Sequence, residues 1–244
     1  AASDVYKRQD LSLWKEEMMG NLRELQLSDC SNCHQLPYLP NVTKITLFKM
    51  HQITDISPTL LPNVTSMWVQ DCAVIRRIQR FPKIKSVTIG FCVRFEGFDG
   101  YNQSNNDAIN QRIILNSLKL HFLPMLDDIP SLPEAYELSI FDCPEIKSFD
   151  GFDRSSFKRK VWISGLNAGN CDMKGLGNIC ELVLNDVSDL IDGKGIHDID
   201  HLMIYHPKNL LNFSNFHGIN QSILLLDVSS LKSFDGLQSI PRLA

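Results

Sequence analysis

No run of apolar residues in this sequence is long enough to span a membrane as a helix. The sequence also lacks G-x-S-x-G, the phosphate-binding G-x-x-x-x-G-K-[ST] and H-E-x-x-H, so it carries no recognisable enzyme signature. Basic residues are not in excess, because the formal net charge is −4, and we therefore expect no nucleic-acid partner. The balance of 43% hydrophobic and 21% charged residues is typical of a folded chain.

Cysteine motifs that bind haem or zinc are almost absent as well. The segment Cys30–His34 matches the C-x-x-C-H pattern of c-type haem attachment. A common type of zinc site needs a second C-x-x-C, and the sequence has none. Because Cys30 and Cys33 also fill apolar positions of the repeat described below, we expect no haem, no metal and no other cofactor.

Histidine and aspartate gather at one place near the end of the chain, at His197, Asp198, Asp200, His201 and His206. On a strand, His201 and His206 would point to opposite faces of the sheet. A solvated surface is the expected interpretation of this group, and a weak metal site is the alternative.

Most apolar residues belong to one pattern that the chain repeats. Asn21–Pro40 has the form L-x-x-L-x-L-x-x-C, followed by apolar residues at every third position. Leu25 and Leu27 alternate as on a strand with one buried face. The later spacing of three is typical of a tight extended or 3₁₀ return path.

The strand-like pair recurs ten times, with steps of 20 to 23 residues and one longer step of 31. The pairs are Leu25/Leu27, Ile45/Leu47, Met67/Val69, Val87/Ile89, Leu118/Leu120, Leu138/Ile140, Val161/Ile163, Leu182/Leu184, Leu202/Ile204 and Ile223/Leu225. A period of this kind predicts a solenoid in which each coil buries its apolar face against its neighbours.

The repeat resembles the leucine-rich repeat family from about Asn21 to Ile240. The doublet Leu36-Pro37 with Leu39-Pro40 resembles the short repeats of bacterial effectors, and the Cys-x-x-apolar-x-x-Leu-Pro order resembles those of plant immune receptors. The resemblance implies an α/β leucine-rich-repeat solenoid: a right-handed arc with a parallel β-sheet on its concave face and a mostly irregular or 3₁₀ convex side.

The ends of the chain and one insertion depart from the repeat. Residues 1–9 include Asp4–Gln9, which looks like a translated sequencing adapter, so we expect a non-native scar on a metagenomic fragment. Residues 10–20 are expected to be a partial repeat or, alternatively, a short capping helix. Residues 21–244 then form the repeat domain of about ten repeats. Its polar insertion near residues 99–113 is either a tolerated surface loop or a contact loop.

Four of the seven cysteines occupy one repeat position that elsewhere holds Met, Leu, Val or Pro. They are Cys30, Cys72, Cys92 and Cys143. A slot that accepts these residue types is expected to be interior, with free thiols rather than disulfides. Free thiols favour a cytoplasmic location, and nothing else in the sequence indicates the compartment.

Two columns of residues are expected on the solvent side of the sheet, because side chains alternate along each strand, and a rim column follows them where each strand ends. The first outward column, between the members of each pair, is Gln26, Thr46, Trp68, Thr88, Lys119, Ser139, Trp162, Val183, Met203 and Leu224. The second outward column, after each pair, is Ser28, Phe48, Gln70, Gly90, His121, Phe141, Ser164, Asn185, Tyr205 and Leu226. The rim column follows, and it includes Phe91, Phe122 and His206.

Large aromatic residues in these columns predict a surface that contacts a partner. The predicted binding residues are Phe48, Trp68, Phe91, Lys119, His121, Phe122, Phe141, Trp162, Tyr205 and His206. Aspartate recurs in the rim column, at Asp29, Asp71, Asp142, Asp186 and Asp227. These carboxylates predict either an acidic rim that tunes association or a residue type that stabilises turns.

The sequence therefore predicts a non-enzymatic recognition module that binds a protein ligand on its concave face. The effector-like Leu-Pro doublets motivate an alternative, the substrate-recognition arm of a larger ubiquitin ligase or immune receptor whose catalytic domain lies outside this fragment. A third hypothesis is that the arc only holds other domains apart.

Overall fold

The computed structural model describes residues 5–6, 20–101, 113–127, 132–150, 152 and 157–237. The chain divides into two compact units. The first comprises Ala1–Leu126 with Ser131–Ala135, and the second comprises Asp127–Pro130 with Tyr136–Ala244.

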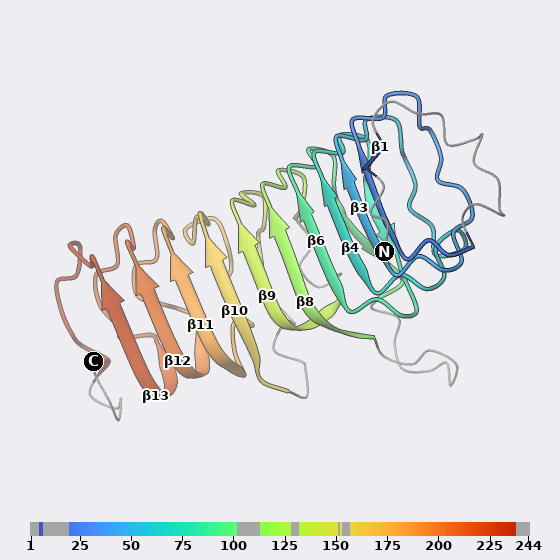
Figure 1. Ribbon diagram of the computed structural model, residues 1–244. Coiled ribbons are helices and arrows are strands. Elements are labelled where there is room, and N and C mark those ends of the chain that lie inside the picture. The colour runs from blue at the N-terminus through green and yellow to red at the C-terminus, as the bar shows by residue number, and fades with distance from the viewer. Residues whose placement is uncertain are drawn as a thin grey trace. The chain divides into compact units, whose positions relative to one another are not determined.

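The first unit is a stack of coils that each contribute one strand to a parallel sheet (Figure 1). Its main sheet has the order β1-β2-β3-β4-β6-β8. The strands are β1 (Val5–Tyr6), β2 (Glu24–Ser28), β3 (Lys44–Phe48), β4 (Ser66–Gln70), β6 (Ser86–Gly90) and β8 (Ile114–His121). Two short strands of the return path, β5 (Arg77–Gln79) and β7 (Gly97–Asp99), pair in parallel as a separate small sheet.

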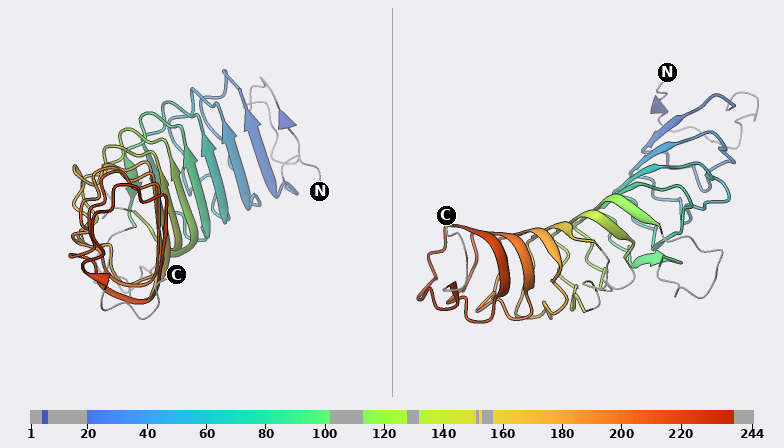
Figure 2. Two further views of the ribbon diagram at one scale, coloured as in Figure 1. Left: turned by 90° about the vertical axis from the view of Figure 1, so that its left-hand side faces the viewer. Right: turned by 90° about the horizontal axis from the view of Figure 1, so that it is seen from below.

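The second unit repeats the same plan with longer strands. Its sheet has the order β9-β10-β11-β12-β13, and the registers of all four pairings are parallel. The strands are β9 (Glu134–Phe141), β10 (Arg159–Ser164), β11 (Ile179–Asn185), β12 (His197–Tyr205) and β13 (His217–Leu226). In this unit, as in the first, the described return segments lead behind the sheet from one strand to the next (Figure 2).

The register confirms the repeat frame. Leu25, Ile45, Met67, Val87 and Leu118 lie opposite one another on successive strands of the first unit. In the second unit the corresponding residues are also register partners on successive strands: Leu138, Val161, Leu182, Leu202 and Ile223. Every member of the ten pairs is at most 3% exposed except Leu225, which is half-buried. The predicted parallel β-solenoid is therefore confirmed.

The interior of each coil also holds the residues predicted to line the return path. Leu36, Leu39 and Phe81 are at most 1% exposed in the first unit, and Phe149 and Phe213 are fully buried in the second. The described residues contain no α-helix, and their only 3₁₀ positions are the single residues 152 and 237. The α/β label is thus not confirmed, because the returns are too short and irregular to include a helix.

The cysteine position is interior, as predicted. Cys30, Cys72, Cys92 and Cys143 are at most 1% exposed. Each thiol donates to the carbonyl of the last residue of its own strand, with Sγ–O distances of 3.3 to 3.5 Å. The thiols therefore act as small apolar groups with one weak donor each.

Several predictions concern residues outside the described ranges. They are the scar at residues 1–9 apart from Val5 and Tyr6, the cap or partial repeat at 10–20 apart from Gly20, and residues 102–112 of the insertion near 99–113. Among the described residues, no helix is long and apolar enough to cross a membrane.

Candidate functional site

The second unit brings four apolar residues into one row on the outward face of its sheet. Trp162, Val183, Met203 and Leu224 are register partners on β10, β11, β12 and β13. Trp162 is 47% exposed, whereas Val183 is only 7% exposed although it also lies on the outward face. Neighbouring strands are about 4.8 Å apart, so Trp162 and Met203 flank Val183 closely enough to shield it.

Aromatic residues of the second outward column widen this row. The rings of Phe141 and Trp162 are 5.5 Å apart between centroids and inclined by 55°. Tyr205 donates its hydroxyl to Met203 Sδ at 3.4 Å. Leu226, at the end of β13, is 46% exposed. We call the set Phe141, Trp162, Val183, Met203, Tyr205, Leu224 and Leu226 the apolar stripe.

A polar ladder borders the apolar stripe where the strands end. The side-chain amide of Asn185 donates to Ser164 Oγ at 3.0 Å, and Asn185 Oδ1 lies 3.3 Å from His206 Nδ1. His206 Nε2 is in turn 2.9 Å from Asp227 Oδ2. These contacts connect β10 to the residue after β13, so the end of the stripe has a continuous polar edge.

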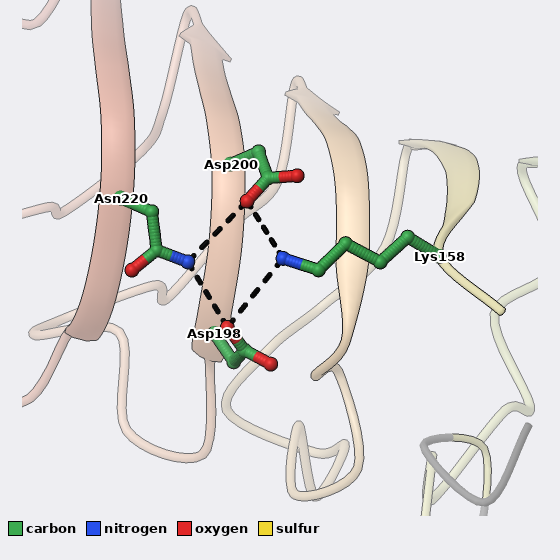
Figure 3. Close-up of polar contacts among 4 residues, drawn as sticks. All are labelled: Lys158, Asp198, Asp200 and Asn220. Carbon is green, nitrogen blue, oxygen red and sulfur yellow. Dashed lines mark hydrogen bonds and ion pairs between the residues drawn. The ribbon is translucent and has the colours of Figure 1, made fainter. Parts of the chain in front are cut away.

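A charged cluster borders the other side, at the start of the strands (Figure 3). Lys158 lies beside the first residue of β10, and its side chain extends across β11 to β12. Lys158 Nζ is 2.7 Å from Asp200 Oδ1 and 3.7 Å from Asp198 Oδ1. Asn220 of β13 donates to the same two carboxylates, at 3.0 Å to Asp198 and 3.3 Å to Asp200.

The contact between Lys158 and Asp200 stabilises the ionised form of both groups. The hydrogen bond from Lys158 is the main cause that lowers the pKa of Asp200, and the same bond is the main cause that raises the pKa of Lys158. The side chain of Asp200 is 15% exposed and that of Lys158 is 36% exposed, so solvent weakens the pair only in part. Beside it, Lys160 of β10 pairs with Glu181 of β11 at 3.4 Å.

A left-handed backbone conformation helps to explain which residue types fill the rim column. Its residue has a positive φ, between 47° and 69°, in all ten coils, including Asp71, Phe91 and Asp186. In eight coils its N–H donates to the carbonyl of the last residue of the next strand, at 2.9 to 3.2 Å. Asp and Asn tolerate this left-handed region better than most residues do. The turn-stabilising explanation of the recurrent aspartates is thus supported, while their carboxylates still line the strand ends.

The first unit has fewer apolar residues on its outward face. Trp68 is 50% exposed, but its register partners are Thr46 and Thr88, and Lys119 follows. Phe48 is half-buried, with the Lys49 ammonium 5.2 Å from its ring centroid. Trp68 is therefore the only apolar residue of this unit in the first outward column.

A stacked aromatic pair occupies the rim of the first unit. The rings of Phe91 and Phe122 are 4.5 Å apart and nearly parallel, at 19°, and each side chain is 44% exposed. Both residues have left-handed backbones, with φ of 55° and 51°, which is unusual for bulky side chains. Gly90 precedes Phe91, and its register partner is His121.

The ten predicted binding residues are thus divided between two separate groups. The first unit holds Phe48, Trp68, Phe91, Lys119, His121 and Phe122, and the second holds Phe141, Trp162, Tyr205 and His206. Val183, Met203, Leu224 and Leu226 lie in the same outward columns but were not among the predicted binding residues. The sequence did contain an indication of them, because apolar residues fill the first outward column in four consecutive repeats, from Trp162 to Leu224.

The predicted histidine and aspartate group does not converge on a metal site. His201 Nδ1 is 2.9 Å from Ser222 Oγ, and Asp198 and Asp200 contact Lys158. Within the described ranges, no group of three His, Cys, Asp or Glu residues is arranged to hold a metal ion. At the C-x-x-C-H motif, Cys30 and Cys33 are buried and His34 is exposed.

A groove of about 920 Å³ lies among the return loops of the second unit. It is lined in part by Asp172, Lys174, Asp192 and Lys194. The two aspartates accept hydrogen bonds from the backbone N–H groups of Lys174 and Lys194, at 2.9 and 3.1 Å. Their carboxylates thus form turns in their own loops, as Asp commonly does.

Comparisons with protein-family models, with curated proteins and with solved structures found no match to this chain.

Proposed function

We propose that this chain is a non-enzymatic recognition module of the leucine-rich-repeat kind that binds a protein ligand with the outward face of its sheet. The observation that supports this proposal is the apolar stripe of the second unit. Four register positions in a row, from Trp162 to Leu224, are apolar on a face that folding leaves open to solvent.

The proposal follows from what a solenoid needs in order to fold. The coils are held together by the inward members of each pair, which are buried, so outward residues are under no such requirement. Single exposed apolar residues are ordinary, but a contiguous apolar patch with a polar border is typical of a binding surface. The stripe has polar borders on both sides, the ladder from Ser164 to Asp227 and the cluster around Lys158.

Trp162 is the expected main anchor of this interface. It is half-exposed, it contacts Phe141, and it lies next to Val183 in register. Tryptophan and tyrosine are enriched among the residues that contribute most to binding energy. Trp68 has a similar exposure and the same repeat position, but it lacks apolar register partners.

The two tryptophans provide a matched experiment. Peptide ligands would be selected from a random library on the full chain, and their affinities measured for the wild type, Trp162→Ala and Trp68→Ala. We expect Trp162→Ala to weaken binding by about 30-fold, the effect of losing an anchor worth about 2 kcal/mol. Trp68→Ala is expected to change the affinity by less than about threefold.

Circular dichroism and urea unfolding would show that both variants keep the fold. The proposal fails if no ligand can be selected, or if the selected ligands bind Trp162→Ala as tightly as they bind the wild type.

A further inference from the structure

The apolar stripe has a direction that limits what can bind along it. Its first-column residues lie across the strands, one on each of β10 to β13. At about 4.8 Å between strands, the row from Trp162 to Leu224 is about 14 Å long. A helix covers that distance in about ten residues, or roughly three turns.

The spacing of the row matches a helix better than an extended strand. Neighbouring side chains on one face of a helix, at positions i, i+3 and i+4, have Cβ atoms about 5–6 Å apart. Side chains on one face of an extended strand are about 6.6 Å apart, because they are two residues apart. A helix lying across the strands can therefore place one apolar side chain opposite each member of the row.

The border at the strand ends has a single sign of charge. In the second unit, the rim column contains Asp142, Asp186 and Asp227, all exposed, and neither it nor the second outward column contains Lys or Arg. His206 contacts Asp227. The opposite border is mixed, since Lys158 faces Asp198 and Asp200, and Lys160 faces Glu181. A ligand therefore meets a consistently acidic edge on one side only.

From these observations we infer that the second unit takes up an amphipathic helix with basic residues along one flank. The helix lies across β10 to β13 with its apolar face on the stripe and its Lys or Arg side chains over Asp142, Asp186 and Asp227. This inference rests on the proposed function, and it adds the class of partner and the side from which charge is recognised.

The probe is a pair of synthetic 18-residue helical peptides. Both carry Leu at positions i, i+3, i+4 and i+7, and they differ only in having Lys or Glu along one flank. Binding to the full chain is measured by fluorescence anisotropy at about 50 mM and about 300 mM salt, because exposed charges are screened over a shorter distance at higher salt. We expect the Lys peptide to bind at least about tenfold more tightly at low salt, and the difference to shrink at high salt.

The rim offers a variant that removes charge and keeps the turn. In Asp142→Asn/Asp186→Asn/Asp227→Asn each side chain keeps its size, and Asn tolerates the left-handed backbone as Asp does. We expect this triple variant to lose the preference for the Lys peptide. Each exposed charge that is removed should lower the ratio of the two peptide affinities by about two- to fivefold. The matched control is Asp29→Asn/Asp71→Asn, which changes the same repeat position in the first unit and should leave both affinities unchanged.

The outcomes separate this inference from the proposed function. If library ligands depend on Trp162 but the Lys and Glu peptides bind equally, or neither binds, the helix inference is wrong and the recognition surface stands. The inference is also wrong if the triple variant keeps the preference or the first-unit control loses it. If no ligand depends on Trp162, both proposals fail.

Discussion

At the scale of single residues, the rim column shows how backbone conformation selects side chains. A left-handed residue follows every main-sheet strand from β2 to β13, and its N–H extends the ladder to the next coil in eight of them. Aspartate fills five of these ten positions, and Gly165 fills another. The stacked pair Phe91 and Phe122 adopts the same backbone despite its bulk. Strained positions of this kind are often functional, so the pair is a second place to look for a contact.

The Lys158 cluster predicts a pH dependence at this scale. The pKa of Asp200 is lowered in the folded protein, so the contact stabilises the fold above the ordinary Asp pKa and is lost as the pH falls through the lowered value. The pKa of Lys158 is raised, so its contribution is present below the ordinary Lys pKa and is lost as the pH rises through the raised value.

We therefore expect Lys158→Gln to lower the free energy of unfolding by about 0.2–1 kcal/mol between about pH 5 and pH 9, and by less outside that window. Urea unfolding of both proteins from about pH 2 to about pH 11 measures the difference. Lys160→Gln serves as the control, because its contact with Glu181 is longer and lacks a second carboxylate. A difference that stays constant down to pH 2 would contradict the assignment of the effect to Asp200.

At the scale of the strand, alternation decides which residues stabilise the fold and which remain available to a ligand. Leu202 and Met203 are neighbours in β12, yet Leu202 is fully buried and Met203 is on the outward face. The same alternation runs through every pair of the repeat. It was predictable because a period of two is a direct property of an extended backbone.

Adjacent residues of β12 should consequently respond very differently to truncation. Leu202→Ala is expected to lower the free energy of unfolding by about 2–5 kcal/mol, because it leaves a cavity between coils. Met203→Ala should cost less than about 1 kcal/mol, since Met203 is half-buried and its truncation leaves no cavity between coils, and should weaken a stripe ligand instead. Denaturant unfolding of the two variants measures the contrast. Equal losses of stability would show that the register of β12 is wrong.

Some features of the strands were not predictable. The short strands β5 and β7 pair in a second sheet on the return path, although their sequences have no pattern that separates them from the irregular returns of other coils. The pairing register also shifts near Arg159 and near Ile199, close to the starts of β10 and β12. Such local shifts depend on how neighbouring coils fit, and a period in the sequence does not specify them.

At the scale of the whole molecule, stacking makes the interior of each coil inaccessible. Six of the seven cysteines are buried, whereas Cys180 is half-buried. Burial raises the pKa of the Cys171 thiol to about 12, which lowers the fraction of reactive thiolate further. Access to these thiols thus reports whether coils separate.

Native thiol labelling should for this reason be strongly selective. With a thiol-specific reagent at neutral pH, we expect Cys180 to be modified first and the six buried cysteines at least about tenfold more slowly, because only thiolate that reaches solvent reacts. Mass spectrometry of peptides from the labelled protein identifies each site. In urea above the unfolding midpoint all seven should react alike. Labelling of Cys30 or Cys72 as fast as Cys180 in native buffer would mean that the coils open readily.

The sequence by itself determined the coil. Its apolar alternation and its steps of 20 to 23 residues were enough to predict every main-sheet strand from β2 to β13, the inward faces and the interior cysteine position, because these follow from local backbone geometry. Tertiary structure alone decided which outward residues meet. Trp162 contacts Phe141, and Lys158 reaches Asp200 across β11, because residues 21 and 42 positions apart become neighbours only when coils stack in register.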